Sequence, residues 1–367
     1  MSLPNLLVHA TNVTGLGASQ VVSSILEGLQ NQLDETPIEA YLPAIGPMAG
    51  LEPVRSAVRF HRFRRRLPNS ISRLLESLFS PAYFPRSTHG LTLGDIPIQT
   101  IDHQVVLVHQ SHLVAPRINV HSKRDLNMRI MRRIFRRNLR FVHHVVVQSD
   151  VMKDELGATY PEIVDRMVVV PQPPPPWFQA PATHLPRENL QGLRLFYPAA
   201  GYPHKNHRLL VEMDQRQPQK LPLQEMRLTL EPEELHREFA SRPSWIQNLG
   251  RLSPQGCRLA YEEVDALFFP SVAESYGLPL VEAMVLGLPV VCSDLPFAQW
   301  MCGDQALYFD PNDADSAWHA IQELEQRWSR AWRPDWSRAL AKLPTDWTAV
   351  AGAFVDLLRT PRPVSSG

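Results

Sequence analysis

The 367-residue sequence has few cysteines, no net charge and no long run of apolar residues. Its three cysteines are too few and too scattered for a disulfide framework or a metal cluster, and they favour a reducing compartment. No apolar stretch approaches the roughly 20 residues of a membrane-spanning helix. No basic segment precedes the apolar residues 6–8, so we expect no cleavable signal sequence. We therefore expect a cytoplasmic protein, either free or peripheral on the inner face of the membrane.

What the chain does have is enough length for two domains and an uneven distribution of charge. Lysine and arginine outnumber aspartate and glutamate by 20 to 15 in residues 1–190, and are outnumbered by 17 to 22 in the remainder. The excess is concentrated in residues 55–140, which hold 17 basic and 4 acidic residues. Most of these basic residues fall in two arginine clusters: Arg59, Arg62, Arg64, Arg65 and Arg66, then Arg129, Arg132, Arg133, Arg136, Arg137 and Arg140.

The second cluster lies in a stretch, residues 125–140, whose apolar residues recur at helical spacing. The pattern predicts a helix with one face in the core and an arginine face outside. That arginine face is either simply solvated or meets anionic lipid headgroups or a phosphorylated acceptor. No recognition motif for nucleic acid accompanies it, so we expect no nucleic acid partner.

A strand, a loop, a helix and a further strand are predicted around residues 265–292. An apolar run over 265–270 precedes the loop, Pro279 suits the first turn of the helix, and Gly287 suits its end. Such a unit belongs to a parallel sheet, and ligands of these sheets bind at the carboxyl ends of the strands. Glu274 falls in that loop and Glu282 in the predicted first helical turn.

The loop and helix start combine anion-binding donors with two carboxylates. The backbone N–H groups of Tyr276, Gly277 and Leu278 can bind an anion, because the first donors of a helix have no partner within it. The carboxylates of Glu274 and Glu282 suit the hydroxyls of a ribose and a sugar. The stretch therefore predicts an anion site flanked by two carboxylates that accept hydrogen bonds from hydroxyls.

Glu274 and Glu282, eight residues apart around Gly-Leu-Pro, resemble the E-x7-E motif of retaining glycosyltransferases of family 4. The resemblance implies the GT-B fold, an α/β architecture of two Rossmann-like doubly wound domains with a nucleotide-sugar cleft between them. It implies that Glu274 contacts the transferred sugar and Glu282 the ribose. It also implies a nucleoside diphosphate sugar as donor, with no metal or other cofactor. Asp313-Ala314-Asp315 is expected to open a helix rather than to bind a metal.

Lys205-Asn206 resembles the pair that opens a helix in this family, where the lysine places a cation on the donor diphosphate. The family usually has an arginine six residues earlier, where this chain has Ala199. His204 or Arg251 could replace that arginine. The stretch around Arg251, residues 244–253, resembles the segment that holds the nucleotide base.

The N-terminal part offers weaker signals. A strand over residues 5–10 leads to Gly15-Leu16-Gly17, which forms either a phosphate cradle or a plain turn and resembles the glycine loop of GT-B enzymes. A second strand ends at His109 and His112. By resemblance His109 is our first candidate for a histidine near the reacting sugar and His112 the second, while a structural histidine is the other interpretation.

These patterns predict an N-terminal, basic, acceptor-side domain over residues 1–175 and a proline-rich linker over 176–192. A donor-side domain follows over 193–345, and a terminal helix over 346–360 crosses back to the first domain. The expected function is that of a retaining glycosyltransferase moving a hexose, mannose or glucose by resemblance, to a glycan or lipid-linked acceptor. The expected pathway is cell-surface polysaccharide or glycolipid synthesis. The alternatives are a non-catalytic sugar- or polyanion-binding protein on a GT-B scaffold, and a GT-B phosphorylase or synthase with a soluble acceptor.

Overall fold

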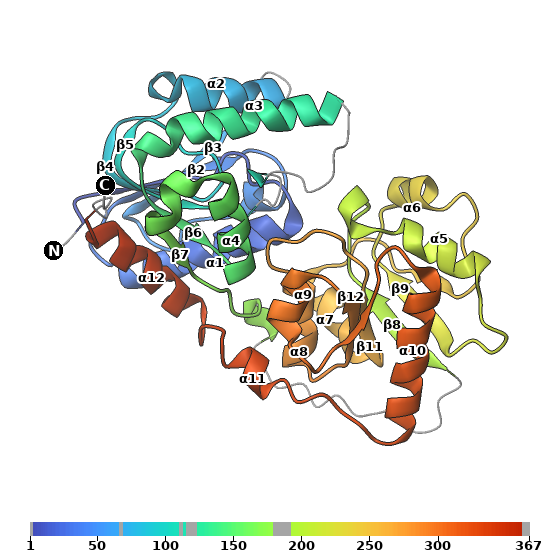
Figure 1. Cartoon of the computed structure of the whole chain (residues 1–367). Coiled ribbons are helices and arrows are strands. Elements are labelled where there is room, and N and C mark those ends of the chain that lie inside the picture. Colours follow the sequence, from blue (N-terminus) through green and yellow to red (C-terminus); the bar gives the residue numbers. More distant parts are fainter. Residues whose placement is uncertain (1–2, 66–68, 110–112, 115–122, 179–191, 362–367) are drawn as a thin grey trace. The chain divides into compact units, whose positions relative to one another are not determined.

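The computed structural model describes residues 3–65, 69–109, 113–114, 123–178 and 192–361 (Figure 1). The chain divides into two compact units. Unit 1 comprises Met1–Pro173 and Pro344–Gly367, and unit 2 comprises Pro174–Leu343. Each unit is described by itself below.

Unit 1 is built on a parallel sheet in the order β3-β2-β1-β4-β5-β6-β7. The strands are β1 (Leu6–His9), β2 (Ile38–Pro43), β3 (Val58–Phe63), β4 (Ser87–Thr92), β5 (Ile101–Leu107), β6 (Val142–Val147) and β7 (Met167–Val169). The central strands contain short apolar runs, such as residues 145–147 of β6, because a sheet covered on both faces buries successive side chains alike. The strand order reverses between β1 and β4, which makes that edge the topological switch point of unit 1.

The helices of unit 1 cover this sheet: α1 (Leu16–Gln32), α2 (Asn69–Leu78), α3 (Lys123–Asn138), α4 (Asp150–Thr159) and α12 (Trp347–Arg359). The C-terminal helix α12 packs against α1 and β5 although it follows unit 2 in the sequence (Figure 1). Gly28 of α1 permits this approach, because a Cβ there would lie 2.8 Å from the Ala351 Cβ and from the Trp347 carbonyl oxygen. Asp346 caps the helix by accepting a hydrogen bond from the Ala349 N–H.

Unit 2 repeats the architecture with a parallel sheet in the order β10-β9-β8-β11-β12-β13. Its strands are β8 (Leu193–Tyr197), β9 (Leu223–Leu228), β10 (Ile246–Asn248), β11 (Ala266–Phe269), β12 (Val290–Ser293) and β13 (Leu307–Phe309). Its helices are α5 (Arg208–Gln215), α6 (Pro232–Glu238), α7 (Pro254–Glu262), α8 (Leu278–Val285), α9 (Pro296–Cys302), α10 (Ala314–Ser329) and α11 (Ser337–Leu340). The switch point of unit 2 lies between β8 and β11.

The chain enters unit 2 through the proline tract and a 3-10 turn over Pro176–Phe178. Phe178, which the sequence analysis places in the linker, is fully buried in the core of unit 2 and packs edge-on to Tyr261 at 5.6 Å. The segment after the prolines is therefore anchored to unit 2. Most of the expected linker, residues 179–191, lies outside the described part of the chain.

Candidate functional site

Lys205 and Glu274 meet at the switch point of unit 2. Lys205 follows β8 and Glu274 follows β11, so the parallel pairing of these two strands brings both loops to the same edge. The Lys205 ammonium donates a hydrogen bond of 2.5 Å to the Glu274 carboxylate. Their side chains are only 15% and 12% exposed, so this is a largely desolvated ion pair. The structure thus brings together the two residues predicted to be catalytic in this domain.

Hydrogen bonds from β8 and from the loop after β11 hold the loop that carries Lys205, called the lysine loop below. The Tyr197 hydroxyl, at the end of β8, donates a 2.5 Å hydrogen bond to the Lys205 carbonyl oxygen. Burial raises the pKa of Tyr197 well above its usual range, so the phenol keeps this proton. The Val272 N–H donates to the His204 carbonyl oxygen at 2.8 Å and ties the two loops together. The Lys205 ammonium also lies 5.5 Å from the ring centre of Phe269.

The helix after Glu274 begins as the sequence predicts. Gly277 is the N-cap of α8 with φ +88°, Leu278 is its first residue, and Pro279 lies in its first turn. A Cβ at Gly277 would also lie 3.0 Å from Leu280, so both conformation and space require glycine. Tyr276 is buried and packs toward Trp300. In the first turn of α8, Pro279 has no N–H and the Leu280 N–H donates to the Gly277 carbonyl oxygen at 2.9 Å. The donors that suit an anion are therefore those at the very start of the helix, at Gly277 and Leu278.

Glu282 lies deeper in α8 than predicted. Because α8 begins at Leu278, Glu282 belongs to its second turn, and the prediction of a first-turn position was wrong. Its carboxylate accepts a 3.0 Å hydrogen bond from the Tyr261 hydroxyl of α7. Burial raises the pKa of Glu282 to about 7, and the bond from Tyr261 opposes that rise.

The arginine that the family places near the diphosphate has no counterpart at Ala199, which is buried in the core of unit 2. Of the predicted replacements, the His204 ring stacks on Tyr202 at 5.7 Å. Arg251 is exposed and lies 3.7 Å from the Glu231 carboxylate.

Sequence reasoning missed a different cation, Arg237 of α6. Its guanidinium donates a hydrogen bond to the Gly201 carbonyl oxygen, in the loop that carries Lys205. Burial, together with the charges of Lys205 and Arg237, lowers the pKa of nearby His207 to about 3. Arg237 therefore places a second positive charge at this edge. No local motif marks it, since only the fold brings α6 to the loop after β8.

The predicted residues of unit 1 gather at its own switch point. Gly15 is the N-cap of α1, with no side-chain cap bond, and Gly17 lies in the first turn of that helix. His109 follows β5, and its backbone N–H donates to the Asp95 carboxylate at 2.8 Å. Its ring Nε2 donates to the Leu93 carbonyl oxygen at 2.7 Å, so the neutral ring carries its proton there. The second candidate, His112, lies outside the described residues.

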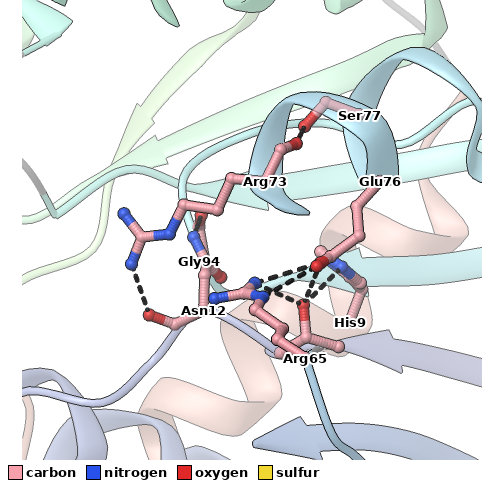
Figure 2. A network of polar contacts seen from close by, with 8 residues as sticks. His9, Asn12, Arg65, Arg73, Glu76, Ser77 and Gly94 are labelled. Carbon is pink, nitrogen blue, oxygen red and sulfur yellow. Dashed lines mark hydrogen bonds and ion pairs between the residues drawn. The ribbon is translucent and has the colours of Figure 1, made fainter. Parts of the chain in front are cut away.

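A buried ion pair underlies the same edge of unit 1 (Figure 2). Arg65, after β3, donates from Nε and Nη2 to the two carboxylate oxygens of Glu76 in α2, at 2.7 and 3.0 Å. The side chains are 9% and 4% exposed. The Thr11 hydroxyl, after β1, donates to Glu76 at 2.7 Å and lies 3.1 Å from the His9 ring. Burial lowers the pKa of His9 to about 4, so this histidine is neutral and structural.

The predicted arginine helix, α3, buries Ile134, Phe135 and Leu139 just beyond its end, and presents arginines outward. Two of these arginines are engaged by the protein itself. Arg136 pairs with Glu162 at 2.7 Å, and Arg132 donates to the Val114 carbonyl oxygen at 2.7 Å. The other exposed arginines of the helix are Arg129, Arg133 and Arg137.

Two further searches cover the described residues only. Within them, no group of three or more histidine, cysteine, aspartate or glutamate side chains is arranged to bind a metal ion. Across the same residues, no helix combines the length and the apolar character needed to cross a membrane. Asp313, half of the Asp-x-Asp sequence, caps α10 by accepting from the Asp315 N–H, as expected.

Residues 195–327 match the family model described as glycosyl transferases group 1, and this segment contains Lys205, Glu274 and Glu282. Part of the chain is 37% identical over 89 residues to O-antigen chain mannosyltransferase B of Escherichia coli. That match covers 24% of this chain and 23% of the relative, so the chain matches about a quarter of the relative's length.

The whole chain is similar in fold to solved glycosyltransferase structures. Sucrose-phosphate synthase from Thermosynechococcus elongatus superposes with a TM-score of 0.71 at 17% identity, covering 97% of this chain and 98% of that one. Anabaena Alr3699/HepE, in complex with UDP and glucose, gives 0.67 at 13% identity, covering 98% and 100%. The two parallel sheets and these likenesses define a GT-B glycosyltransferase fold, as the sequence predicts. Within it, the match to the group 1 glycosyltransferase model covers residues 195–327, most of unit 2.

Proposed function

We propose that the protein is a retaining glycosyltransferase that moves a hexose from a nucleoside diphosphate sugar to a glycan or lipid-linked acceptor. The observation that carries the proposal is the Lys205–Glu274 contact of 2.5 Å at the switch point of a group 1 glycosyltransferase domain. The similarity to an O-antigen chain mannosyltransferase supports a mannose donor and a cell-surface polysaccharide or glycolipid as product.

In this proposal, each of these groups of unit 2 has a part in the transfer. The Lys205 ammonium and the first N–H groups of α8 would stabilise the negative charge that develops on the leaving diphosphate. Glu274, already within hydrogen-bonding reach of Lys205, would accept hydrogen bonds from the hydroxyls of the transferred sugar. Glu282 would accept from the ribose in the same way. The transfer uses no metal cofactor and no covalent side-chain nucleophile.

Arg237 takes the place, in this proposal, of the arginine that is absent at Ala199. It reaches the lysine loop from α6 through its bond to the Gly201 carbonyl oxygen. Arg237 also pairs with Glu238 of the same helix at 2.9 Å, and its side chain is 57% exposed. Turning toward a bound diphosphate would break this exposed ion pair, which costs about 1 kcal/mol or less. Arg237→Gln should therefore raise the donor KM more than it lowers kcat.

The assay begins with a thermal-shift screen of nucleoside diphosphate sugars and continues with turnover of the donor that binds. Lys205→Gln and Glu274→Gln should each lower turnover at least about 100-fold, the typical effect of removing one transition-state contact. Glu233→Gln, at an exposed position of α6, is the matched control. Turnover should survive EDTA. Near wild-type rates in both site variants would refute the assignment.

The second candidate is a protein that binds nucleotide sugars without transferring them. The burial of Ala199, where the family supplies a cation, is the observation that favours it. Donor binding with neither transfer nor hydrolysis, across the glycan acceptors tested, would select this alternative.

A membrane-associated acceptor is the finer part of the proposal. Arg129, Arg133 and Arg137 recur every four residues on the exposed face of α3 and have no ion-pair partner among the described residues. Each can contribute about 1 kcal/mol at an anionic bilayer, so the three together predict about 100-fold tighter binding. This attraction should weaken as salt rises, because exposed charges are screened within about 10 Å at 0.1 M.

Co-sedimentation with phosphatidylserine-containing vesicles tests this part. The triple change of Arg129, Arg133 and Arg137 to Gln should abolish low-salt binding. Arg136→Gln, in an arginine that already pairs with Glu162, should change it little. If wild-type protein does not co-sediment with anionic vesicles at low salt, the arginines are only a solvated face. That result would favour a soluble acceptor.

A further inference from the structure

Unit 1 holds an arginine that the fold positions and that has no ion-pair partner in the part of the chain that the structure describes. Arg73 of α2 lies at the switch point of unit 1, beside the buried Arg65–Glu76 pair (Figure 2). Its Nη2 donates a 2.9 Å hydrogen bond to the carbonyl oxygen of Asn12, in the loop after β1. The Asn12 side chain in turn donates to the carbonyl oxygen of Gly94, in the loop after β4. Arg73 is thus fixed against the two loops that diverge at the switch point.

Asn12 is the one hydrogen-bond acceptor that Arg73 contacts among the described residues, and none of their carboxylates lies within 4.0 Å of its guanidinium. Its Nε is shielded from solvent and has no acceptor. Nη1 makes no hydrogen bond and points away from the Arg65–Glu76 pair in Figure 2. Burial and the charge of Arg65 lower the pKa of Arg73, and the charges of Asp95 and Glu76 partly oppose that shift.

Arginines with a purely structural part in this unit look different. Arg55 donates to the carbonyl oxygens of Gln30 and Leu33. Arg65 donates from Nε and Nη2 to both carboxylate oxygens of Glu76, and from Nη2 to the Thr11 hydroxyl as well. A partly buried guanidinium is stable only when its charge is paired or its donors are satisfied. Arg73 satisfies one donor of five, so its arrangement suits a partner that comes from outside the chain.

The chemistry of that partner follows from the charges at this edge. Glu76 is already paired with Arg65 at 2.7 Å, and Asp95 attracts Arg73 without forming an ion pair within 4.0 Å. Arg73 therefore has no close carboxylate partner among the described residues. Three residues beyond Asn12, helix α1 starts at Gly15 without a side-chain cap and without an acidic residue in its first turn. A guanidinium fork beside a helix start that carries no negative charge matches the oxygens of a phosphate.

We propose that Arg73 binds a phosphate group of a substrate at the switch point of unit 1, as an anion site additional to Lys205. That the phosphate belongs to a transfer substrate rests on the proposed function, whereas phosphate binding itself does not. The source is either a phosphorylated sugar that accepts the hexose or the diphosphate of the donor. Both present the same oxygens to Arg73, and the experiment below separates them.

The experiment measures binding of inorganic phosphate and of a hexose 1-phosphate to the full chain by calorimetry and thermal shift. Arg73→Met removes the charge and keeps most of the side-chain volume, while Arg73→Lys keeps the charge. Arg64→Met, at an exposed position of the same arginine cluster, is the control for net charge. Lys205→Gln removes the cation of unit 2.

Wild type and Arg64→Met should bind phosphate alike, and Lys205→Gln should keep the phosphate site at Arg73. At that site Arg73→Met should lose at least tenfold in affinity, and Arg73→Lys should retain part of it. Without phosphate, Arg73→Met should melt no lower than wild type, because the lost charge had no partner. If Arg73→Met loses binding of hexose 1-phosphate alone, the phosphate at Arg73 belongs to the acceptor. If it also loses binding of a nucleoside diphosphate, the phosphate belongs to the donor. Equal phosphate binding by Arg73→Met and wild type, or none by wild type, would overturn the proposal. If the protein transfers no sugar, the proposed function fails, but the phosphate-binding results still test the role of Arg73.

Discussion

The raised pKa of Glu282 makes a quantitative prediction about stability. In the unfolded chain this carboxyl ionises near its ordinary value of 4.5, and in the folded protein burial raises the pKa to about 7. Between these two pH values the folded protein retains a proton that the unfolded chain has released. Stability therefore falls as pH rises through this interval, and the full cost is present above about pH 7. At about 1.4 kcal/mol per pKa unit the difference corresponds to about 3 kcal/mol.

Glu282→Gln removes the titration and leaves an amide oxygen that can still accept from Tyr261. The unfolding free energy of the variant minus that of wild type should increase by about 2–3 kcal/mol from about pH 5 to about pH 8. Urea unfolding at both pH values, followed by the near-ultraviolet signal of the tryptophans, measures this gain. Glu233→Gln, an exposed carboxyl of unit 2, should show no comparable change between the two pH values. An equal difference between Glu282→Gln and wild type at both pH values would refute the reasoning.

The same carboxyl links stability to donor binding. If Glu282 accepts hydrogen bonds from a ribose, it must do so as a carboxylate, and binding near pH 6.5 will release a proton. Calorimetry in two buffers of different ionisation enthalpy counts that proton. Glu282→Gln should release none, and a wild type that also releases none would remove Glu282 from the ribose site.

Three further predictions concern stability alone, each checked by urea unfolding with circular dichroism as the readout. Glu76→Leu should cost about 3–5 kcal/mol, because it leaves Arg65 buried without its partner, and adding Arg65→Met should restore most of that loss. Gly277→Ala should cost about 1–2 kcal/mol, because φ is +88° and the new methyl group meets Leu280. Asp313→Ala should cost about 1 kcal/mol through loss of the α10 N-cap, and Asp313→Asn should cost little.

The sequence predicts unit 2 well where the signal is local. Pro279 and Gly287 mark the start and end of α8, and the structure confirms both, with Gly287 in the left-handed region at φ +69°. The loop position of Glu274 is also confirmed. These features depend on backbone conformations that proline and glycine encode by themselves, so a single sequence reveals them.

Features that depend on contacts between distant elements were missed. Nothing in the stretch around Glu282 indicates that Tyr261, on another helix, would donate to it. Arg237 reaches Gly201 only because α6 and the loop after β8 end at the same side of the sheet. Phe178 was placed in a linker because the prolines before it are typical of spacers, yet its ring fills part of the unit 2 core.

The two switch points show why the candidate residues of unit 2 could be named and Arg73 could not. In unit 2, Lys205 and Glu274 each belong to a stretch that resembles a known motif. The pairing of β8 with β11 then brings the two loops together. In unit 1, Arg73 is one of several arginines in a basic region and has no motif around it. Its distinction is that Glu76 is taken by Arg65 while Arg73 meets only a backbone carbonyl. That difference arises from the folded structure, in which Arg73 of α2 contacts the loop after β1 and Asn12 of that loop contacts the loop after β4. A count of charges along the sequence cannot distinguish Arg73 from the other arginines of the region.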